Sequence, residues 1–565
     1  MQYDLVVRGG VLVDGLNVPR RRADVAVKNG VIAAIGDIPV SDATEVLDAS
    51  GMIVAPGFID LHTHYDAQLF WDPWCSLSGW HGVTSLAIGN CGFGFAPARA
   101  ESQEYLMRSL TRVEAIPYAA IKASLPWSWE SFPEWLDAVE AQPKGMNMMA
   151  YVPLNPLLTY VMGYEAAKSR DATESERSQM AQLLEEAIEA GACGWSAQRT
   201  PPGSGADMQR DYDGTPFSTD LMSNATALSL ATVLSRYEGT FIQTVLKTGD
   251  PDGDLAHIEE LAEASSAPIL YNTVNTDSRF PDRHRLLLKW IRSCQERALP
   301  IYAQCLTTDA GFSFTFEDWN LWDESPAWRE ATLGTVAERL SKLGDPARRA
   351  ALKEQPPTAF PMERLVVLRP RSEKFQPARG LLLADAARIM GYADQVDLLL
   401  DMIVEDELTT LFQAPQLNDD LDLQAEVVRA PYGIWGVSDG GAHTKFITSG
   451  AYPTESIINF VRERGLVTLE EAHYRLSYLP ARCAGFNGRG SIVEGAPADI
   501  VVYDYENLSL RDEEVAYDLP GGEWRRIRKA DGYRWIIVNG QVTFVDGEPT
   551  GTLPGQLLRR ESVHV

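Results

Sequence analysis

The sequence predicts an α/β protein, a (β/α)8 TIM barrel with a small β-sandwich domain formed from both chain ends. Three observations lead to this fold. Both ends are rich in short alternating strands, the long middle alternates strand-like and helix-like stretches, and several chemistry-bearing side chains directly follow apolar strands. Repeated βα units favour a barrel of parallel strands, and the active sites of such barrels lie at the carboxyl ends of the strands.

The two chain ends have the same strand-and-turn texture. Asn29-Gly30 separates two apolar runs near the N-terminus, and Asn539-Gly540 does so near the C-terminus. Asn-Gly between apolar runs is a strong hairpin signal. We expect strands at Asp4–Arg8, Val11–Val13, Ala26–Lys28, Val31–Ile35, Ile500–Tyr503, Trp535–Val538 and Gln541–Thr543.

The middle of the chain reads as repeated βα units. Glu101–Thr111 and Glu174–Ala190 are plausible amphipathic helices. The predicted strands are Ala192–Ser196, Thr240–Leu246, Pro268–Tyr271, Pro300–Ala303 and Ile434–Val437. The barrel is therefore expected over residues 55–487, the composite sandwich over 1–54 and 488–545, and a C-terminal tail over 546–565.

Residues 306–365 do not fit a single βα unit. They combine an aromatic-rich run with a charged helical stretch around Leu340–Lys353. Two interpretations stay open: a lid inserted over the site, or a second small core packed on the barrel rim.

The charge of the chain excludes some partners. It has 565 residues, with 50 basic and 78 acidic side chains and a formal net charge of −28. Such a chain would repel nucleic acid and anionic membranes, so the expected partner is a small-molecule substrate. The sequence leaves a homo-oligomer open.

The cysteines and the apolar runs indicate the compartment. Six cysteines are scattered without a CxxC pair, the first residues lack the regions of a signal peptide, and no apolar run approaches a membrane span. A reducing cytoplasm is the expected location.

The most informative motif is the run from Pro56 to His64. Apolar residues before it read as a buried strand, and His62 and His64 follow two residues apart. Successive strand side chains alternate faces, so the two imidazoles point the same way. Two neutral imidazoles side by side can hold a divalent metal ion.

Further motifs accompany this one. They are Gly82-Val83-Thr84-Ser85, Gly89-Asn90-Cys91-Gly92, Ser438-Asp439-Gly440-Gly441-Ala442-His443, and Gly495-Ala496-Pro497-Ala498-Asp499-Ile500-Val501-Val502. With the His62/His64 strand, the chain resembles the amidohydrolase superfamily and, within it, the N-acyl-D-amino-acid deacylase (D-aminoacylase) family. The resemblance runs from about residue 3 to about residue 545, and it also implies the composite sandwich.

The resemblance assigns roles to two of these residues. It implies that Cys91 is a metal ligand, where the sequence alone also allows a small buried apolar residue. It implies that Asp439 is the catalytic acid. A carboxylate beside a metal-bound water can take its proton and pass it to the leaving nitrogen. The structural alternative for Asp439 is a cap of the next helix.

Four more residues are candidates for substrate binding. His443 could contact the substrate, orient Asp439, or be structural. Arg199 is a candidate clamp for a substrate carboxylate, or a surface arginine. Lys247 is the only lysine in a plausible strand for the carboxylated lysine of other superfamily members. Gln243 is a candidate for a neutral polar contact, as are Asn272, Asn275 and Gln304.

The chain departs from the family at the middle strands. D-aminoacylases place two further metal histidines there, and none of the eight histidines of this chain lies in the corresponding segments. His257 falls in a helix-like stretch and is expected to face solvent. His62, His64, Asp439 and Cys91 suffice for one zinc ion with an open position, so we expect one ion rather than two.

The sequence therefore predicts a zinc-dependent amidohydrolase that cleaves a non-peptide C–N bond of an N-acylated amine or amino acid. One alternative is a hydantoinase-like cyclic amide hydrolase. Another is a non-catalytic barrel that binds a small ligand.

Overall fold

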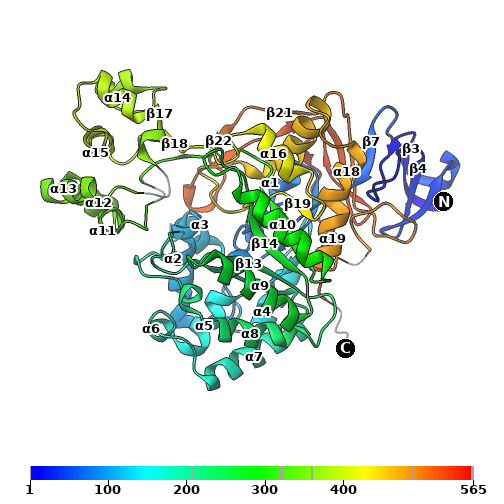
Figure 1. Ribbon diagram of the computed structural model, residues 1–565. Helices are drawn as coiled ribbons and strands as arrows, with labels where there is room; N and C mark the ends of the chain where they lie inside the picture. Colours follow the sequence, from blue (N-terminus) through cyan, green and yellow to red (C-terminus); the bar gives the residue numbers. More distant parts are fainter. Residues whose placement is uncertain are drawn as a thin grey trace.

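The chain folds into a mixed α/β protein with several sheets (Figure 1). The structure is a computed structural model, and it describes residues 2–205, 209–309, 311–317, 322–357, 361–486 and 488–560. In this part of the chain, no helix combines the length and the apolar character that crossing a lipid bilayer requires.

Parallel strands form the centre of the molecule. One sheet has the order β10-β9-β8 and a second the order β11-β12-β13-β14-β15-β19, and all of their pairings are parallel. The bounds are β8 Phe58–Asp60, β9 Val83–Ile88, β10 Asn147–Ala150, β11 Val152–Pro153, β12 Gly194–Arg199, β13 Phe241–Leu246, β14 Ile269–Val274, β15 Ile301–Cys305 and β19 Gly433–Trp435. We refer to these two parallel sheets together as the row. The strands predicted in the middle of the chain all coincide with strands of this row.

The two ends of this row approach each other beyond the strands. Thr63, which follows β8, forms a parallel bridge with Gly440, which follows β19. The amide of His64 donates to the carbonyl of Gly440 at 2.6 Å. The segments that carry His62, His64 and Asp439 are therefore joined by backbone hydrogen bonds.

Helices follow most of these strands and cover their outer side. α7 (Glu174–Glu189), α8 (Asn224–Leu234), α9 (Pro251–Ser265) and α10 (Arg283–Glu296) each precede the next strand of the row. α7 begins with a capping box between Thr173 and Glu176, which pairs otherwise unsatisfied donors of the first turn. The expected helix near residues 101–111 is α2 (Gln103–Val113).

The inner side of the row has its own hydrophobic cluster. Its buried members include Ile59, Tyr151, Phe241, Leu270 and Ile434, which come from different strands of the row. Because strand side chains alternate, this cluster identifies the inner face of each strand. That face leads, at the carboxyl ends, to the polar side chains described below.

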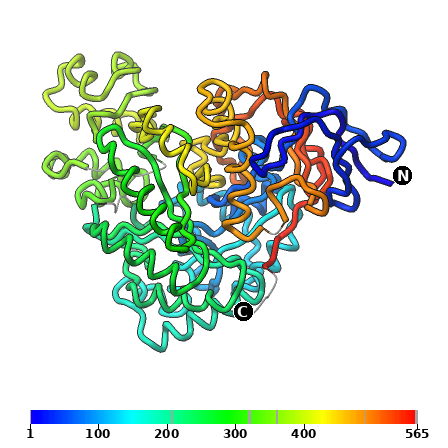
Figure 2. Tube along the Cα trace, turned by 45° about the vertical axis from the view of Figure 1, so that its right-hand side comes forward, coloured from blue at the N-terminus to red at the C-terminus, as the bar shows by residue number. Residues whose placement is uncertain are grey.

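Both chain ends contribute to one seven-stranded sheet, of order β27-β26-β25-β20-β7-β2-β3. Its outer strands are β2 Val11–Leu12, β3 Arg21–Arg22, β26 Gln541–Val545 and β27 Glu548–Pro549. β20 (Ile500–Tyr503) pairs with β7 (Ile53–Pro56) and with β25 (Tyr533–Val538). The blue and red segments accordingly run side by side in Figure 2. A four-stranded sheet of order β5-β4-β1-β6 lies nearby, and residues of both sheets share a hydrophobic cluster. Its strands are β1 Tyr3–Arg8, β4 Asp24–Lys28, β5 Val31–Gly36 and β6 Ala43–Asp48.

The two Asn-Gly hairpins are confirmed. β4 (Asp24–Lys28) pairs antiparallel with β5 (Val31–Gly36), and β25 pairs with β26 (Gln541–Val545). Asn29 and Asn539 adopt φ values of 51° and 47°, as the tight turn requires.

A second core lies in the upper left of Figure 1. Its members run mainly from Phe312 to Ala414, so it extends beyond the expected insertion at 306–365. The elements are β16 Ser313–Phe314, α11 Pro326–Thr332, α12 Val336–Gly344, α13 Pro346–Glu354, β17 Val366–Arg369, α14 Leu383–Ile389, α15 Gln395–Glu405 and β18 Leu411–Gln413. This cluster favours the interpretation as a second small core over that of a simple lid.

The expected C-terminal tail begins with β27 (Glu548–Pro549) and returns to the central strands. The amide of Leu558 donates to the carbonyl of Met148 at 2.7 Å. Residues 561–565 of the tail lie outside the described residues.

Asp499 joins the chain-end sheet to the central strands, and we expect its loss to destabilise the protein. Its buried carboxylate pairs with Arg489 and accepts hydrogen bonds from Asn147 and the amide of Asn539. Asp499→Asn would leave Arg489 buried without a counter-charge, at a cost of about 3–5 kcal/mol.

A fall in the denaturant midpoint, followed by tryptophan fluorescence, checks this expectation. Asp531→Asn, which removes an exposed pair with Arg511, is the matched control and should change the midpoint little. Equal midpoints for the two variants would contradict the role of Asp499.

Candidate active site

His62 and His64 lie just beyond β8, and both are almost completely buried. The amide of His62 donates to Asp60 at 3.1 Å, and its Nδ1 lies 3.1 Å from Oε1 of Gln304. The two imidazole rings are 5.5 Å apart between centroids. Strand alternation thus brings both rings to one place, with the Nε2 atom of His62 left for other partners.

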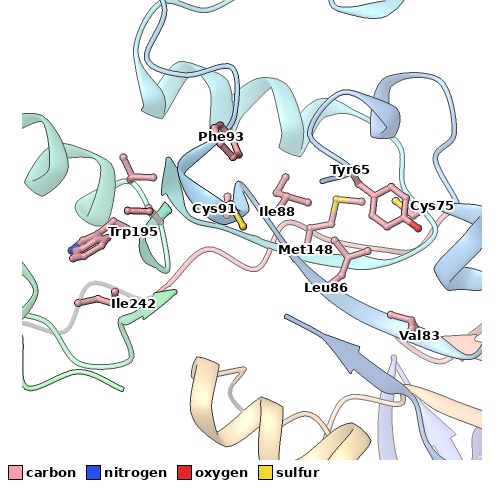
Figure 3. Packing of buried hydrophobic residues seen from close by; sticks show 14 of the residues in the cluster. Tyr65, Cys75, Val83, Leu86, Ile88, Cys91, Phe93, Met148, Trp195 and Ile242 are labelled. Atoms are coloured by element: carbon pink, nitrogen blue, oxygen red, sulfur yellow. The ribbon is translucent and has the colours of Figure 1, made fainter. Parts of the chain in front are cut away.

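Cys91 follows β9 and lies close to Ile88 of that strand (Figure 3). It adopts φ 58° in the turn Asn90–Gly92, and its amide donates to Oε1 of Gln243 at 2.8 Å. Its Sγ lies 3.5 Å from Nε2 of His62. One donor atom each from His62, His64 and Cys91 lie within 4.8 Å of one another, so Cys91 is in position to bind the same ion as the two imidazoles.

Asp439 approaches this group from the segment after β19. Its Oδ1 lies 3.1 Å from Nε2 of His62 and 3.8 Å from Nε2 of His64. Burial alone would raise the pKa of Asp439, but the hydrogen bond with His62 and the nearby imidazoles lower it well below its usual range. The neighbouring imidazoles therefore favour the ionised form of this carboxylate.

The backbone around Asp439 forms a tight turn, and no helix begins there. Asp439 has φ 47°, and the next helical turn starts only at Ser449. The helix-cap alternative is therefore excluded. A Cβ at Gly440 would lie 2.7 Å from the ring of Tyr65, and one at Gly441 would lie 2.5 Å from the carbonyl oxygen of His64. The two glycines are what allows the segment to approach the histidine strand so closely.

Glu114 is a member of the site that the sequence analysis missed. It follows α2 and is almost fully buried. Its Oε2 lies 3.6 Å from Nε2 of His64 and 3.3 Å from Nε2 of His443. Burial alone would raise the pKa of Glu114, but the charges of His64 and His443 lower it. No motif marks this glutamate in the sequence.

His443 contacts Glu114 twice. Besides the side-chain contact, its amide donates to the carbonyl of Glu114 at 2.6 Å. The hydrogen bond with Glu114 outweighs burial and raises the pKa of His443. The side chain of His443 therefore contacts Glu114. The expectation that it contacts the substrate stays a prediction.

Neutral amides line the floor of the site. Gln243 accepts from the amide of Cys91, and Gln304 contacts His62 while donating to the carbonyl of Gly436 at 3.2 Å. Oδ1 of Asn272 is buried and has no hydrogen-bond partner among the described residues. Of these, Gln243 and Asn272 lie in the two middle segments where the family resemblance implies imidazoles.

Arg199 does not join the group. On β12 it shares the strand face of Trp195 and Ala197, which belong to the outer hydrophobic cluster. Its guanidinium donates to the carbonyl of Met222 and to Asn224, and it is buried rather than on the surface. The contacts of Arg199 are thus with the loop before α8 and with the start of α8.

Lys247 follows β13 on the face that carries Gln243, so it lies on the same face of the sheet as the site.

His257 is on α9, as its helical surroundings predict, but the expectation that it faces solvent is wrong. It is 2% exposed, and its Nδ1 contacts Glu260 at 3.0 Å. The residues Ile258 and Leu261 pack α9 against the outer cluster, and His257 is buried with them.

The donor set fits a zinc ion. Two imidazoles, one thiol and one carboxylate are zinc ligands. Atoms bound to one zinc at about 2.0–2.3 Å lie roughly 3.3–3.8 Å apart. The distances from His62 to Cys91 and from Asp439 to the two imidazoles, 3.5, 3.1 and 3.8 Å, are close to this spacing.

Parallel strands that carry such a donor set at their carboxyl ends are typical of metal-dependent hydrolases. Residues 45–544 match the Amidohydrolase family, and the chain belongs to this family.

Two relatives and one solved structure extend the comparison. An N-acyl-D-glutamate deacylase of Alcaligenes xylosoxydans xylosoxydans is 27% identical over 99% of this chain and 97% of its own length. An uncharacterized protein of Mycobacterium tuberculosis is 34% identical over 44% of this chain, and the match spans only 41% of that relative. The crystal structure of N-acyl-D-glutamate deacylase from Bordetella bronchiseptica, complexed with zinc and a phosphonate inhibitor, has a TM-score of 0.69 at 24% identity, covering 99% of this chain and 100% of that one. This likeness shows a shared fold.

Proposed function

We propose that this protein is a zinc-dependent amidohydrolase that cleaves the amide bond of an N-acyl-D-amino acid. One observation carries the proposal: donor atoms of His62, His64, Cys91 and Asp439 converge at the carboxyl ends of parallel strands. The relative and the solved structure that are deacylases of N-acyl-D-glutamate support this substrate class.

In this proposal, His62, His64 and Cys91 hold the zinc ion, with Asp439 beside it. A zinc ion there would lower the pKa of a bound water molecule and polarise the amide carbonyl. The carboxylate of Asp439 accepts the proton of the attacking water and passes it to the leaving nitrogen. Glu114 keeps His64 and His443 in place through its contacts with both rings.

The proposal includes the architecture around the site. The row from β8 to β19 corresponds to eight parallel strands when β10 and β11 are counted as one, and we propose that they close into a (β/α)8 barrel. The bridge between Thr63 and Gly440 supports closure. The division into a composite sandwich, a barrel with an insertion and a tail, and a location in the cytoplasm, are part of the same proposal.

A substrate panel tests the activity. The zinc-loaded protein is incubated with D and L forms of N-acetyl amino acids and with cyclic amides, and release of the free amine is measured. We expect hydrolysis of D-configured acyl amino acids, loss of activity after chelation, and recovery on adding zinc. Turnover that survives complete metal removal would overturn the proposal, as would a zinc-loaded protein that cleaves only cyclic amides.

We further expect that one equivalent of metal restores full activity. The positions of Gln243 and Asn272 offer neutral amides, which are poor zinc ligands beside imidazole and thiolate. Titrating zinc into metal-free protein should raise the rate linearly up to about one equivalent. A rate that stays low until a second equivalent is added would contradict a single catalytic ion.

A further inference from the structure

Lys247 lies on the inner face of the strand that also carries Gln243. On β13, Phe241 packs against Tyr151 at 4.8 Å within the inner cluster, and Gln243 contacts Cys91. The amide of Lys247 donates to the carbonyl of Arg199 at 3.0 Å, so the strand pairing continues through Lys247. Alternation therefore places the Lys247 side chain on the face of Phe241 and Gln243.

Lys247 has no anionic partner in the described part of the chain. Among the described residues, no carboxylate lies within 4.0 Å of its amino group and no side-chain hydrogen bond is found for it. Burial and the charge of Arg283 lower its pKa to about 8. Other buried lysines of this chain do have partners. Lys168 pairs with Asp211, Lys445 contacts Glu523 at 3.0 Å, and Lys144 donates to the carbonyl of Glu140.

Arg283 adds a second cation to the same region. It is the first residue of α10, which follows β14, the neighbour of β13. It too has no ion pair among the described residues. Two neighbouring cations repel each other, and one of them is partly buried, so an anion from outside the chain would stabilise both.

We propose that Lys247, assisted by Arg283, binds a carboxylate group of the substrate. The inference rests on the proposed function and names the feature that the enzyme requires in its substrate. The Cα atoms of Lys247 and Gln243 are about 13 Å apart along the strand, at roughly 3.3 Å per residue. The long lysine side chain covers part of that span. Arg199, a candidate clamp in the sequence analysis, lies on the strand face of Trp195 and Ala197, which belongs to the outer cluster.

The test compares free acids with carboxamides. Lys247→Met keeps much of the side-chain length and removes the charge, Lys247→Arg keeps the charge, and Lys289→Met at an exposed lysine of α10 is the matched control. Each variant is assayed with an N-acyl amino acid, with its α-carboxamide and, for acidic amino acids, with its side-chain carboxamide. The last two substrates distinguish the two sources of the bound carboxylate, which are the α-carboxylate and the side-chain carboxylate of an acidic amino acid.

We expect Lys247→Met to raise KM for the free acid about 10- to 100-fold, with a much smaller change in kcat. For the carboxamide that lacks the bound carboxylate, KM should be the same for Lys247→Met as for wild type. Lys247→Arg should recover most of the loss, and Lys289→Met should behave as wild type. An equal effect of Lys247→Met on acids and on both carboxamides would overturn the proposal.

A second readout does not depend on turnover. An amine-reactive reagent labels Lys247 near pH 8, and mass spectrometry measures the label with and without the N-acyl amino acid. Protection by the free acid but not by the carboxamide supports the anion site even if no substrate is cleaved. Unchanged labelling overturns it, whatever the outcome for the proposed activity.

Discussion

Asp439→Asn should leave a folded protein that has lost turnover by about 10²- to 10⁴-fold or more. The amide keeps the shape of the carboxylate and removes the proton acceptor that lies 3.1 Å from Nε2 of His62. The neighbouring imidazoles lower the pKa of Asp439, so the group that asparagine replaces is a charged carboxylate. Rates on a cleaved N-acyl amino acid and circular dichroism of both proteins check the prediction.

The control for this variant is Asp282→Asn, which removes an exposed carboxylate that pairs with Arg285. It should retain the wild-type rate. Metal content is measured in parallel, because Asp439 also lies close enough to ligate the ion. A folded Asp439→Asn protein with a near-normal rate would rule out Asp439 as the group that transfers the proton.

The double variant His62→Ala, His64→Ala should bind almost no metal, less than about a tenth of an equivalent after gel filtration. It removes both imidazoles from the donor group and leaves Cys91 and Asp439, too few protein ligands for a tight site. Elemental analysis of the purified protein measures the effect directly.

A second double variant controls for the loss of two buried imidazoles. His257→Ala, His284→Ala removes two rings that contact Glu260 and Glu426, neither of which is part of the donor group. Its metal content should equal that of wild type. Retention of metal by the His62, His64 variant would mean that the ion is bound elsewhere.

Much of the site could be predicted because it depends on local pattern. Alternation along a strand puts His62 and His64 on one face, and the two Asn-Gly pairs define hairpins by the φ values that they tolerate. The same rule distinguishes Lys247 from Arg199, because Lys247 shares the face of Gln243 while Arg199 shares that of Trp195. Applied to each strand of the row, it indicates which side chains face the site.

Other parts could not be predicted because they depend on contacts between distant segments. Glu114 lies at the end of an ordinary amphipathic helix, and only the packing of α2 beside the segment of His443 gives it two imidazole partners. The extent of the second core, from Phe312 to Ala414, likewise follows from tertiary packing. The burial of His257 depends on how α9 packs against the strands.

Anomalous X-ray scattering at the zinc edge, from crystals of the protein purified with zinc, tests most directly whether the ion binds at the proposed site. We expect one strong peak in the site, at about 2.0–2.3 Å from donor atoms of His62, His64 and Cys91 and beside the carboxylate of Asp439. A map without a peak at these residues, or with the zinc bound only at other side chains, would contradict it.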